Sequence, residues 1–285
     1  MPEDPVAPAV ATFARYRADE VVRLADYETD DTDDLTREEA RVELASLVER
    51  IAELQARLYA EESRAVLVVL QGIDAAGKDS TVKHVFSGSN PQGVRVYSYK
   101  EPTPEEAAHD FLWRYHAACP ALGMIHVFNR SHYEDVLVVR VKGLVEEERW
   151  RSRYESINDF ERILVRERCV VLKFFLHISK DAQLERFRER LEREDKHYKF
   201  SANDVRERRH WDAYQEAYED AVKATSTPWA PWYIVPSDRK WFRNLVVARI
   251  VCAVLEAMDP RWPLPDEDLE AYALDELEDS ASSRR

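Results

Sequence analysis

Five short runs of apolar, largely β-branched or aromatic residues recur along the chain, separated by stretches with helical periodicity. The runs are AVLVVL (65–70), VRVYSY (94–99), MIHVF (124–128), VVLKFFLHI (170–178) and WYIVP (232–236). A run without polar alternation is typical of a strand that is buried on both faces of a parallel sheet. Helical stretches at about 147–167, 179–194, 204–223 and 239–258 can supply the crossovers between such strands. The pattern predicts a three-layer α/β fold with a five-stranded parallel sheet.

The 285 residues suit one large α/β domain, which we place at 36–263. It begins with the capping box TREE (36–39), followed by leucine and isoleucine at spacings of three and four. Residues 1–35 are acidic and rich in proline and alanine, and we expect a poorly ordered arm with a short helix at about 12–26. Residues 264–285 are predicted to be an acidic tail.

The net charge of −14 comes entirely from the two ends of the chain. Residues 1–39 carry 12 acids and 4 bases, residues 264–285 carry 8 acids and 2 bases, and residues 40–263 are formally neutral. The neutral middle therefore does not exclude a polyanionic ligand. Three further features favour a cytoplasmic protein without a membrane partner. The apolar runs are too short to span a bilayer, the N-terminus (MPEDPVAPAV) has no leader pattern, and the three cysteines are widely spaced.

The motif GxxxxGK occurs once, as GIDAAGK at 72–78, directly after one predicted strand and before a predicted helix. In this context the glycines let the backbone curl so that its N–H groups face an anion, and the lysine reaches the phosphates. The alternative, a glycine turn with a surface lysine, does not explain why both flanking elements are present. We interpret this segment as a phosphate-binding loop.

Two residues depart from the usual form of this loop. Position 79 is aspartate where a magnesium-binding Ser or Thr is usual, and Ser80 and Thr81 follow it. Asp74 places a second carboxylate inside a loop built for anions, which is costly unless the carboxylate ligates magnesium or orients a phosphate. The alternative for Asp74 is a side chain turned outward to cap a local N–H group.

The third predicted strand runs into FNRSHYED (128–135). Asn129 stands where a metal-site acid is usual in P-loop folds, Arg130 follows at once, and Glu134 could supply the missing negative charge. An arginine at this position suits the oxygens of a phosphoryl group in transfer. Each of these residues could instead belong to an ordinary surface ion pair.

Residues 186–209 hold nine Lys or Arg against six acids. We predict that a helical lid at about 183–206 carries these cations over the phosphate site. A solvated, salt-bridged helix is the alternative. Nucleic-acid binding is not expected, because few aromatic residues accompany the basic ones.

Five blocks of the sequence resemble the polyphosphate kinase 2 family, in order over roughly 40–260. They are LQGIDAAGKDS (70–80), HDFLWRYH (109–116), FNRSHYEDVLVVRV (128–141), KHYKFSANDVRERRHWDAY (196–214) and TSTPWAPWYIVPSDRKWFRN (225–244). Members are P-loop proteins similar to thymidylate kinase that move a phosphoryl group between inorganic polyphosphate and a nucleotide. A subgroup that prefers nucleoside diphosphates carries FDRSWYN, whereas FNRSHYE resembles the third subgroup, which accepts AMP as well as ADP.

The resemblance implies polyphosphate-dependent phosphorylation of AMP to ADP, and of ADP to ATP, with Mg²⁺ (or Mn²⁺ as a substitute). It implies a homodimer or homotetramer, and adenine or guanine nucleotides as acceptors. The implied catalytic residues are Asp74, Lys78, Arg130 and Glu134, and the implied metal ligands are Asp74, Asn129 and Glu134. The implied phosphate or polyphosphate ligands are Gly72, Ala75, Ala76, Gly77, Lys78, Asp79, Ser80, Arg140, Arg186, Arg190, Lys196 and Lys199. Lys100, His109, Asp110, Trp113 and Arg114 are the implied nucleotide-binding residues, with core packing as the alternative for His109 and Trp113.

Two other functions fit the same motifs less well. An ATP-dependent nucleoside monophosphate kinase would share the fold, but the acid within the loop and the missing strand-end acid disfavour it. A non-catalytic polyphosphate or nucleotide sensor would be expected to lack one of Asp74, Lys78 or Arg130, and all three are present.

Overall fold

The computed structural model describes residue 9, residues 11–18, residues 21–265 and residue 269. The strands are β1 (Ala65–Gln71), β2 (Val94–Ser98), β3 (Ile125–Asn129), β4 (Cys169–His177) and β5 (Trp232–Pro236). All pair in parallel, in the order β2-β3-β1-β4-β5. The predicted five-stranded α/β fold is confirmed.

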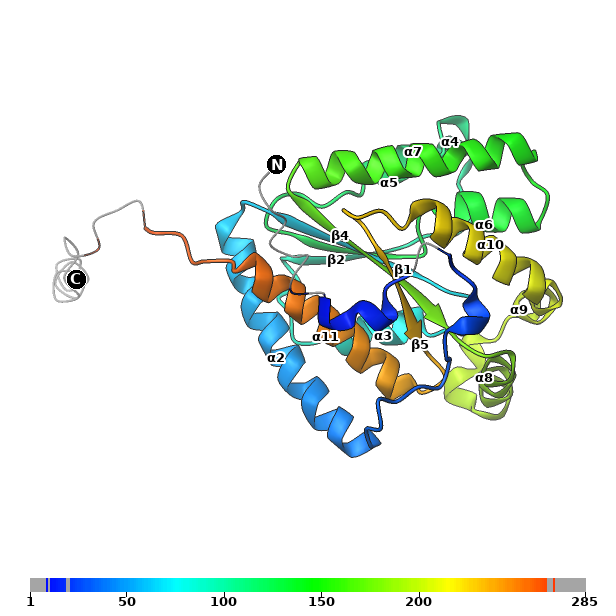
Figure 1. The fold of residues 1–285 in the computed structure, drawn as a ribbon, viewed down its shortest axis with the longest axis horizontal. Helices are drawn as coiled ribbons and strands as arrows, with labels where there is room; N and C mark the ends of the chain where they lie inside the picture. Colours follow the sequence, from blue (N-terminus) through cyan, green and yellow to red (C-terminus); the bar gives the residue numbers. More distant parts are fainter. Residues whose placement is uncertain (1–8, 10, 19–20, 266–268, 270–285) are drawn as a thin grey trace, which may run out of the picture.

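Two helical layers enclose the sheet (Figure 1). One layer contains α2 (Arg37–Glu61), α3 (Lys78–Val85) and α11 (Lys240–Met258), and the other contains α6 (Glu134–Val141), α7 (Glu147–Arg166) and α10 (Trp211–Thr225). Short helices α4 (Pro104–Ala108) and α5 (Trp113–His116) connect β2 to β3. The capping box begins α2 at Thr36, and a second one begins α4 at Thr103, because each threonine and the glutamate three residues later exchange hydrogen bonds.

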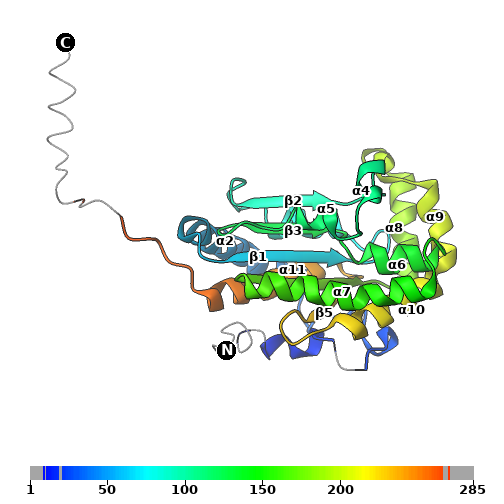
Figure 2. The ribbon, with the colours of Figure 1, turned by 90° about the horizontal axis from the view of Figure 1, so that it is seen from above.

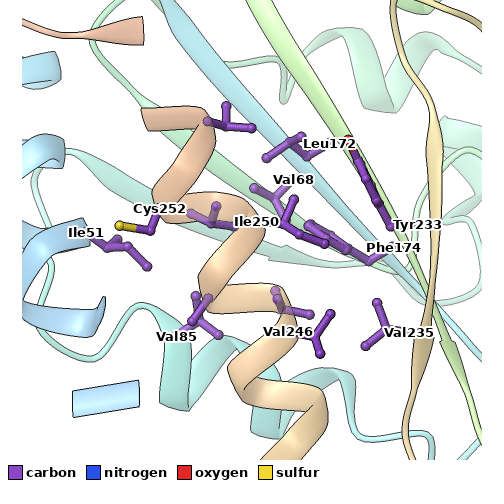
Figure 3. Packing of buried hydrophobic residues seen from close by; sticks show 14 of the residues in the cluster. Ile51, Val68, Val85, Leu172, Phe174, Tyr233, Val235, Val246, Ile250 and Cys252 are labelled. Carbon is purple, nitrogen blue, oxygen red and sulfur yellow. The ribbon is translucent and has the colours of Figure 1, made fainter. Parts of the chain in front are cut away.

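The hydrophobic core lies on both faces of β1. Alternate residues Val66, Val68 and Leu70 pack towards α11, and Figure 3 shows Val68 near Ile250 of that helix. Leu67 and Val69 pack towards α7 and α10. Because both faces are buried, the run needs no polar alternation. Strand β2 differs from the expected apolar strand: it lies at the sheet edge and is partly exposed.

The N-terminal segment departs from the prediction of a poorly ordered arm, which is wrong for residues 11–18 and 21–35. The segment contains short 3₁₀ turns, η1 (Ala11–Tyr16) and η2 (Leu24–Asp26), rather than one helix over 12–26. Arg17 forms an antiparallel bridge with Tyr233, and the N–H of Ala18 donates to the carbonyl of Trp232 at 2.9 Å. The segment therefore covers the free edge of β5, which an exposed strand requires. Most of the predicted C-terminal tail lies outside the described residues.

The predicted lid extends from α8 (Lys180–Glu192) through η3 (Glu194–Lys199) to α9 (Ala202–Glu207). The single helix expected at 204–223 is instead divided into α9, the turn η4 (Arg208–His210) and α10. Figure 2 shows the lid helices at the end of the sheet towards which β1 and β3 point. In the described part of the chain, no helix is long and apolar enough to cross a membrane.

Candidate active site

The phosphate loop joins the carboxyl end of β1 to the first turn of α3. Gly77 takes a left-handed conformation (φ 104°) and precedes Lys78, the first residue of the helix. Leu70 pairs with Asn129 across β1 and β3, so the end of β3 lies beside the loop. The loop N–H groups and the positive end of α3 therefore face the cleft beneath the lid, as an anion site requires.

Lys78 lies folded into the loop that precedes it. Its Nζ donates to the carbonyl of Gly72 at 2.7 Å, and the side chain is buried. Burial, and then the neighbouring charge of Arg130, lower the pKa of Lys78 to about 8. A phosphate in the cleft would offer this ammonium a charged acceptor in place of a carbonyl.

Asp74 and Arg130 form an ion pair across the mouth of the loop. Arg130 Nη2 lies 2.7 Å from Asp74 Oδ1, and both side chains remain partly exposed. Although burial opposes its charge, the carboxylates of Glu134 and Asp74 hold the pKa of Arg130 above its ordinary value. Asp74 is thus turned towards the end of β3, and the alternative of a local outward cap is wrong.

Asn129 and Asp79 form a second cross-loop contact. The Asn129 amide donates to Asp79 Oδ1 at 2.6 Å. In P-loop folds an acid is usual at the end of this strand. Here the strand end carries the neutral Asn129, and the acid is Asp79 in the first turn of α3. The pair keeps one negative charge beside the loop.

Glu134 begins α6 and lines the same cleft, and its side chain forms no hydrogen bond or ion pair with another described residue. The segment before it is held by a buried network. His132 Nε2 lies 3.2 Å from Glu161, and Lys173 Nζ lies 2.6 Å from the same carboxylate. Burial alone would raise the pKa of Glu161, but the charges of Lys173 and His132 hold this pKa below its usual range. The network fixes the backbone between Arg130 and Glu134.

A cleft of about 1160 Å³ lies between the loop and the lid. Its lining includes most of the predicted site residues: Gly72, Asp74, Ala75, Gly77, Lys78, Asp79, Ser80, Lys100, Arg114, Asn129, Arg130, Glu134, Arg190 and Lys199. Residues from five separate segments of the chain are therefore brought to one cavity, whose size suits a nucleotide-sized ligand.

Several predicted ligands do not line this cleft. Arg140 is paired with Asp220 and Glu216 at 2.7 Å each, and Lys196 is paired with Glu189. The buried Ala76, which was expected to bind phosphate as part of the loop, is also absent from the cleft lining. A role of these three residues in binding phosphate or polyphosphate stays a prediction.

The predicted nucleotide residues divide in the same way. Lys100 and Arg114 line the cleft, whereas His109, Asp110 and Trp113 lie outside it. His109 and Trp113 stack on each other at 4.2 Å on the surface, so the alternative of core packing is wrong for them, and nucleotide binding by these residues stays a prediction.

Arg186 was expected to touch polyphosphate but lies behind the loop. Its guanidinium is 7% exposed and donates to the carbonyls of Ala75 at 2.6 Å and Ala76 at 3.0 Å. A second buried arginine, Arg243 of α11, donates to the same Ala76 carbonyl at 3.0 Å. Sequence reasoning did not single out Arg243, although it lies within the family-like block 225–244, which was the available signal.

Other lining residues were also missed. Gln183 Nε2 donates to the backbone carbonyl of Asp74 at 2.9 Å, and Arg208 donates to Gln183 Oε1 at 2.8 Å. Lys142, Tyr214 and Tyr218 line the cleft as well. Arg208 and Tyr214 lie within the basic block 196–214, which was the available signal for them.

The residues present fit a magnesium ion only in partnership with a substrate. Across the described ranges, no three His, Cys, Asp or Glu side chains converge as a ready-made metal site. Mg²⁺ is usually bound by one or two carboxylates together with substrate phosphates, and Asp74, Asp79 and Glu134 line one cleft with the phosphate loop. The donor set is therefore of the right kind.

The fold and cleft define a P-loop protein of the kinase-like α/β class. The family model for polyphosphate kinase 2 matches residues 34–263, and the chain belongs to that family. It is 47% identical over 263 residues to the AMP/ADP-polyphosphate phosphotransferase of Meiothermus ruber, covering 92% of this chain and 98% of that protein.

Two further matches support the assignment. The ADP-polyphosphate phosphotransferase of Rhodopseudomonas palustris is 43% identical, covering 77% of this chain and 80% of that protein. The crystal structure of polyphosphate kinase 2 from Arthrobacter aurescens TC1 superposes with a TM-score of 0.87 at 38% identity, covering 95% of both chains. The resemblance that the motifs indicated thus extends over the whole fold.

Proposed function

We propose that the protein transfers a phosphoryl group from inorganic polyphosphate to AMP, giving ADP, and to ADP, giving ATP. The observation that carries the proposal is the Asp74–Arg130 pair at 2.7 Å over the phosphate loop, with the unpaired Glu134 beside it. The carboxylates of Asp74 and Glu134 and the guanidinium of Arg130 therefore lie together where the segment FNRSHYE (128–134) borders the phosphate loop. The relatives named above act on AMP, ADP and polyphosphate, and the cleft has room for such substrates.

In the proposed reaction the chain supplies position and charge rather than a nucleophile. Lys78 and the loop N–H groups hold phosphate oxygens, and Arg130 offsets the charge on the group in transfer. Asp74 and Glu134 face the acceptor side of the same cleft. Cations that line the cleft from the lid, such as Lys199, hold the polyphosphate chain.

We also propose Mg²⁺ as the cofactor, with Asp74 and Glu134 as its ligands and Mn²⁺ as a substitute. Asn129 donates to Asp79 through its amide nitrogen at 2.6 Å, so a metal ion would be bound through its amide oxygen, and its role as a third ligand stays a prediction. The ion, when bound, would neutralise phosphate charge. The use of guanine nucleotides and a dimeric or tetrameric state remain predictions.

One assay tests the proposed function. The protein is incubated with AMP, Mg²⁺ and either long-chain polyphosphate or ATP, and ADP is followed by chromatography. We expect ADP from polyphosphate, and a Lys78→Ala preparation purified in the same way controls for contaminating kinases. Product with ATP alone as donor would support a nucleoside monophosphate kinase instead. Tight polyphosphate binding without turnover would support a sensor.

A further inference from the structure

Two buried arginines approach the phosphate loop from the side away from the cleft. Arg186 comes from α8 and Arg243 from α11, with exposed fractions of 7% and 0%. Both donate to the Ala76 carbonyl at 3.0 Å. Their other acceptors are neutral: Arg186 donates to the carbonyls of Ser237 and Asp238, and Arg243 donates to the side-chain oxygen of Asn244 at 2.8 Å.

These guanidiniums lack the partner that a buried cation usually has. Among the residues that the structure describes, no carboxylate lies within ion-pair distance of Arg186 or Arg243. Burial, together with the positive charge of Arg186, lowers the pKa of Arg243 to about 9. A buried charge without a charged partner is costly, and two like charges side by side are more so. Asp238 and Glu189 offset the charge of Arg186 in part from beyond ion-pair distance, but burial still lowers the pKa of Arg186. The ligand-free fold therefore holds positive charge behind the loop that is only partly compensated.

The shared carbonyl determines the direction of the next peptide group. The chain has no cis peptide bonds among the described residues, and in a planar trans peptide the N–H points opposite to the C=O. Because both arginines hold the Ala76 oxygen, the N–H of Gly77 is directed away from them. Gly77 lines the cleft, so this N–H faces the phosphate side.

Gly77 and Arg243 also fit each other sterically. A Cβ atom on Gly77 would lie 2.0 Å from Arg243 Nη1, and Gly77 has φ 104°, which side chains rarely adopt. The guanidinium therefore occupies the space that a side chain at position 77 would fill. A side chain at position 77 would therefore displace the guanidinium from the loop, in addition to straining the turn.

We propose that Arg186 and Arg243 are positioning residues for phosphoryl transfer, which orient the peptide between Ala76 and Gly77 and supply positive charge to the bound phosphates from behind the loop. An incoming polyphosphate anion compensates the two guanidiniums, so part of its binding energy comes from relief of their repulsion. The inference rests on the proposed function only in naming polyphosphate as the anion.

The test measures binding of long-chain polyphosphate without acceptor, by calorimetry, for Arg243→Gln and Arg243→Lys. We expect Arg243→Gln to weaken binding by roughly tenfold or more, the scale of one lost charge-assisted interaction, and Arg243→Lys to retain most of the affinity. An equal loss of polyphosphate affinity in both variants would show that the positive charge of Arg243 does not strengthen binding. If the wild-type protein itself failed to bind polyphosphate, the proposed function would fail rather than this inference.

Two further measurements distinguish a role in binding from a purely structural role. They are the salt dependence of polyphosphate affinity and the unfolding temperature of the ligand-free protein. Buried charges are poorly screened, so the ratio of wild-type to Arg243→Gln affinity should persist at high salt. Lys199 is an exposed cation of the same cleft, so the ratio of wild-type to Lys199→Gln affinity should fall towards one at high salt. The ligand-free Arg243→Gln protein should unfold at an unchanged or higher temperature, because a costly charge is gone. If Arg243→Gln and Arg186→Gln both failed to fold, the arginines would be structural and the proposal would be overturned.

Discussion

The cations on the two sides of the cleft differ in their partners. Behind the loop, Arg186 and Arg243 are buried against neutral oxygens. On the lid, the cations are paired with acids: Arg190 lies 2.9 Å from Asp204, and Lys196 contacts Glu189. These two lid cations are therefore salt-bridged in the ligand-free protein, whereas Lys199 lines the cleft without an ion pair among the described residues.

The difference shows how one site can bind a polyanion firmly and still release it. Exposed ion pairs contribute about 0–1 kcal/mol each, so lid cations can exchange a carboxylate for a phosphate at little cost. Arg186 and Arg243 cannot exchange partners in this way, because neither has a paired carboxylate to release. We therefore expect substitutions on the loop side to have large effects and those on the lid to have small ones.

The largest effect is expected for Lys78→Ala. This variant removes the only lysine that points into the loop from α3, and turnover with polyphosphate and AMP should fall at least ~10²-fold, the scale of one preorganised charge contact. Lys83→Ala, on the exposed side of the same helix, is the matched control and should retain its rate. A near-normal rate for Lys78→Ala would mean that the loop is not the transfer site.

The pH dependence should reveal the same lysine. Because burial and Arg130 lower the pKa of Lys78 to about 8, its charge is lost as the pH rises through that value in the free protein. We expect kcat/KM for polyphosphate to decline above about pH 8, by up to about tenfold per pH unit. Lys78→Arg stays charged over this range and should lack the decline. An identical decline in Lys78→Arg would assign it to another group.

Glu134→Asn tests the one unpaired carboxylate on the loop side. The glutamate lines the cleft, raises the pKa of the nearby Arg130 and forms no direct ion pair among the described residues, so its carboxylate can still contact an acceptor or its metal ion. We expect the substitution to reduce the rate with AMP about fivefold more than the rate with ADP, the scale of one lost polar interaction. Rates with both acceptors, measured side by side, give the ratio. An equal loss on AMP and ADP would remove Glu134 from acceptor choice.

The smallest effect is expected on the lid. Hydrogen bonds from Lys196 and Lys240 lower the pKa of Glu189 to about 2, so its carboxylate competes with polyphosphate at any working pH. Glu189→Gln should lower the KM for polyphosphate about twofold to threefold at low salt, in line with the small energies of exposed pairs. The difference should disappear in about 0.5 M salt. A higher KM would instead show that Glu189 holds Lys196 in position.

Much of the fold and site could be predicted from local patterns. The five strands, the capping box at 36–39 and the loop at 72–78 depend on neighbours a few residues away, and each was found close to its predicted place. Asp74, Lys78, Arg130 and Glu134 line one cleft because parallel strands bring their carboxyl ends to the same edge of the sheet.

The N-terminal segment shows where such reasoning stops. Its acidic composition predicts disorder, yet Arg15 pairs with Asp31 and Asp33, and the backbone of Leu24 bonds to Glu219, 195 residues away. Each contact depends on a partner that no local window contains.

The sequence by itself therefore determined the order of elements, the phosphate loop and the membership of the polyphosphate kinase 2 family, since all three are written in short, ordered motifs. Only the tertiary structure decided which basic residues carry free charge. Arg186 lies on a helix face that resembles that of Arg190, but one is buried behind the loop and the other is paired with Asp204 on the lid. Burial and partnership are set by elements distant in the chain, and they govern what a charge can do.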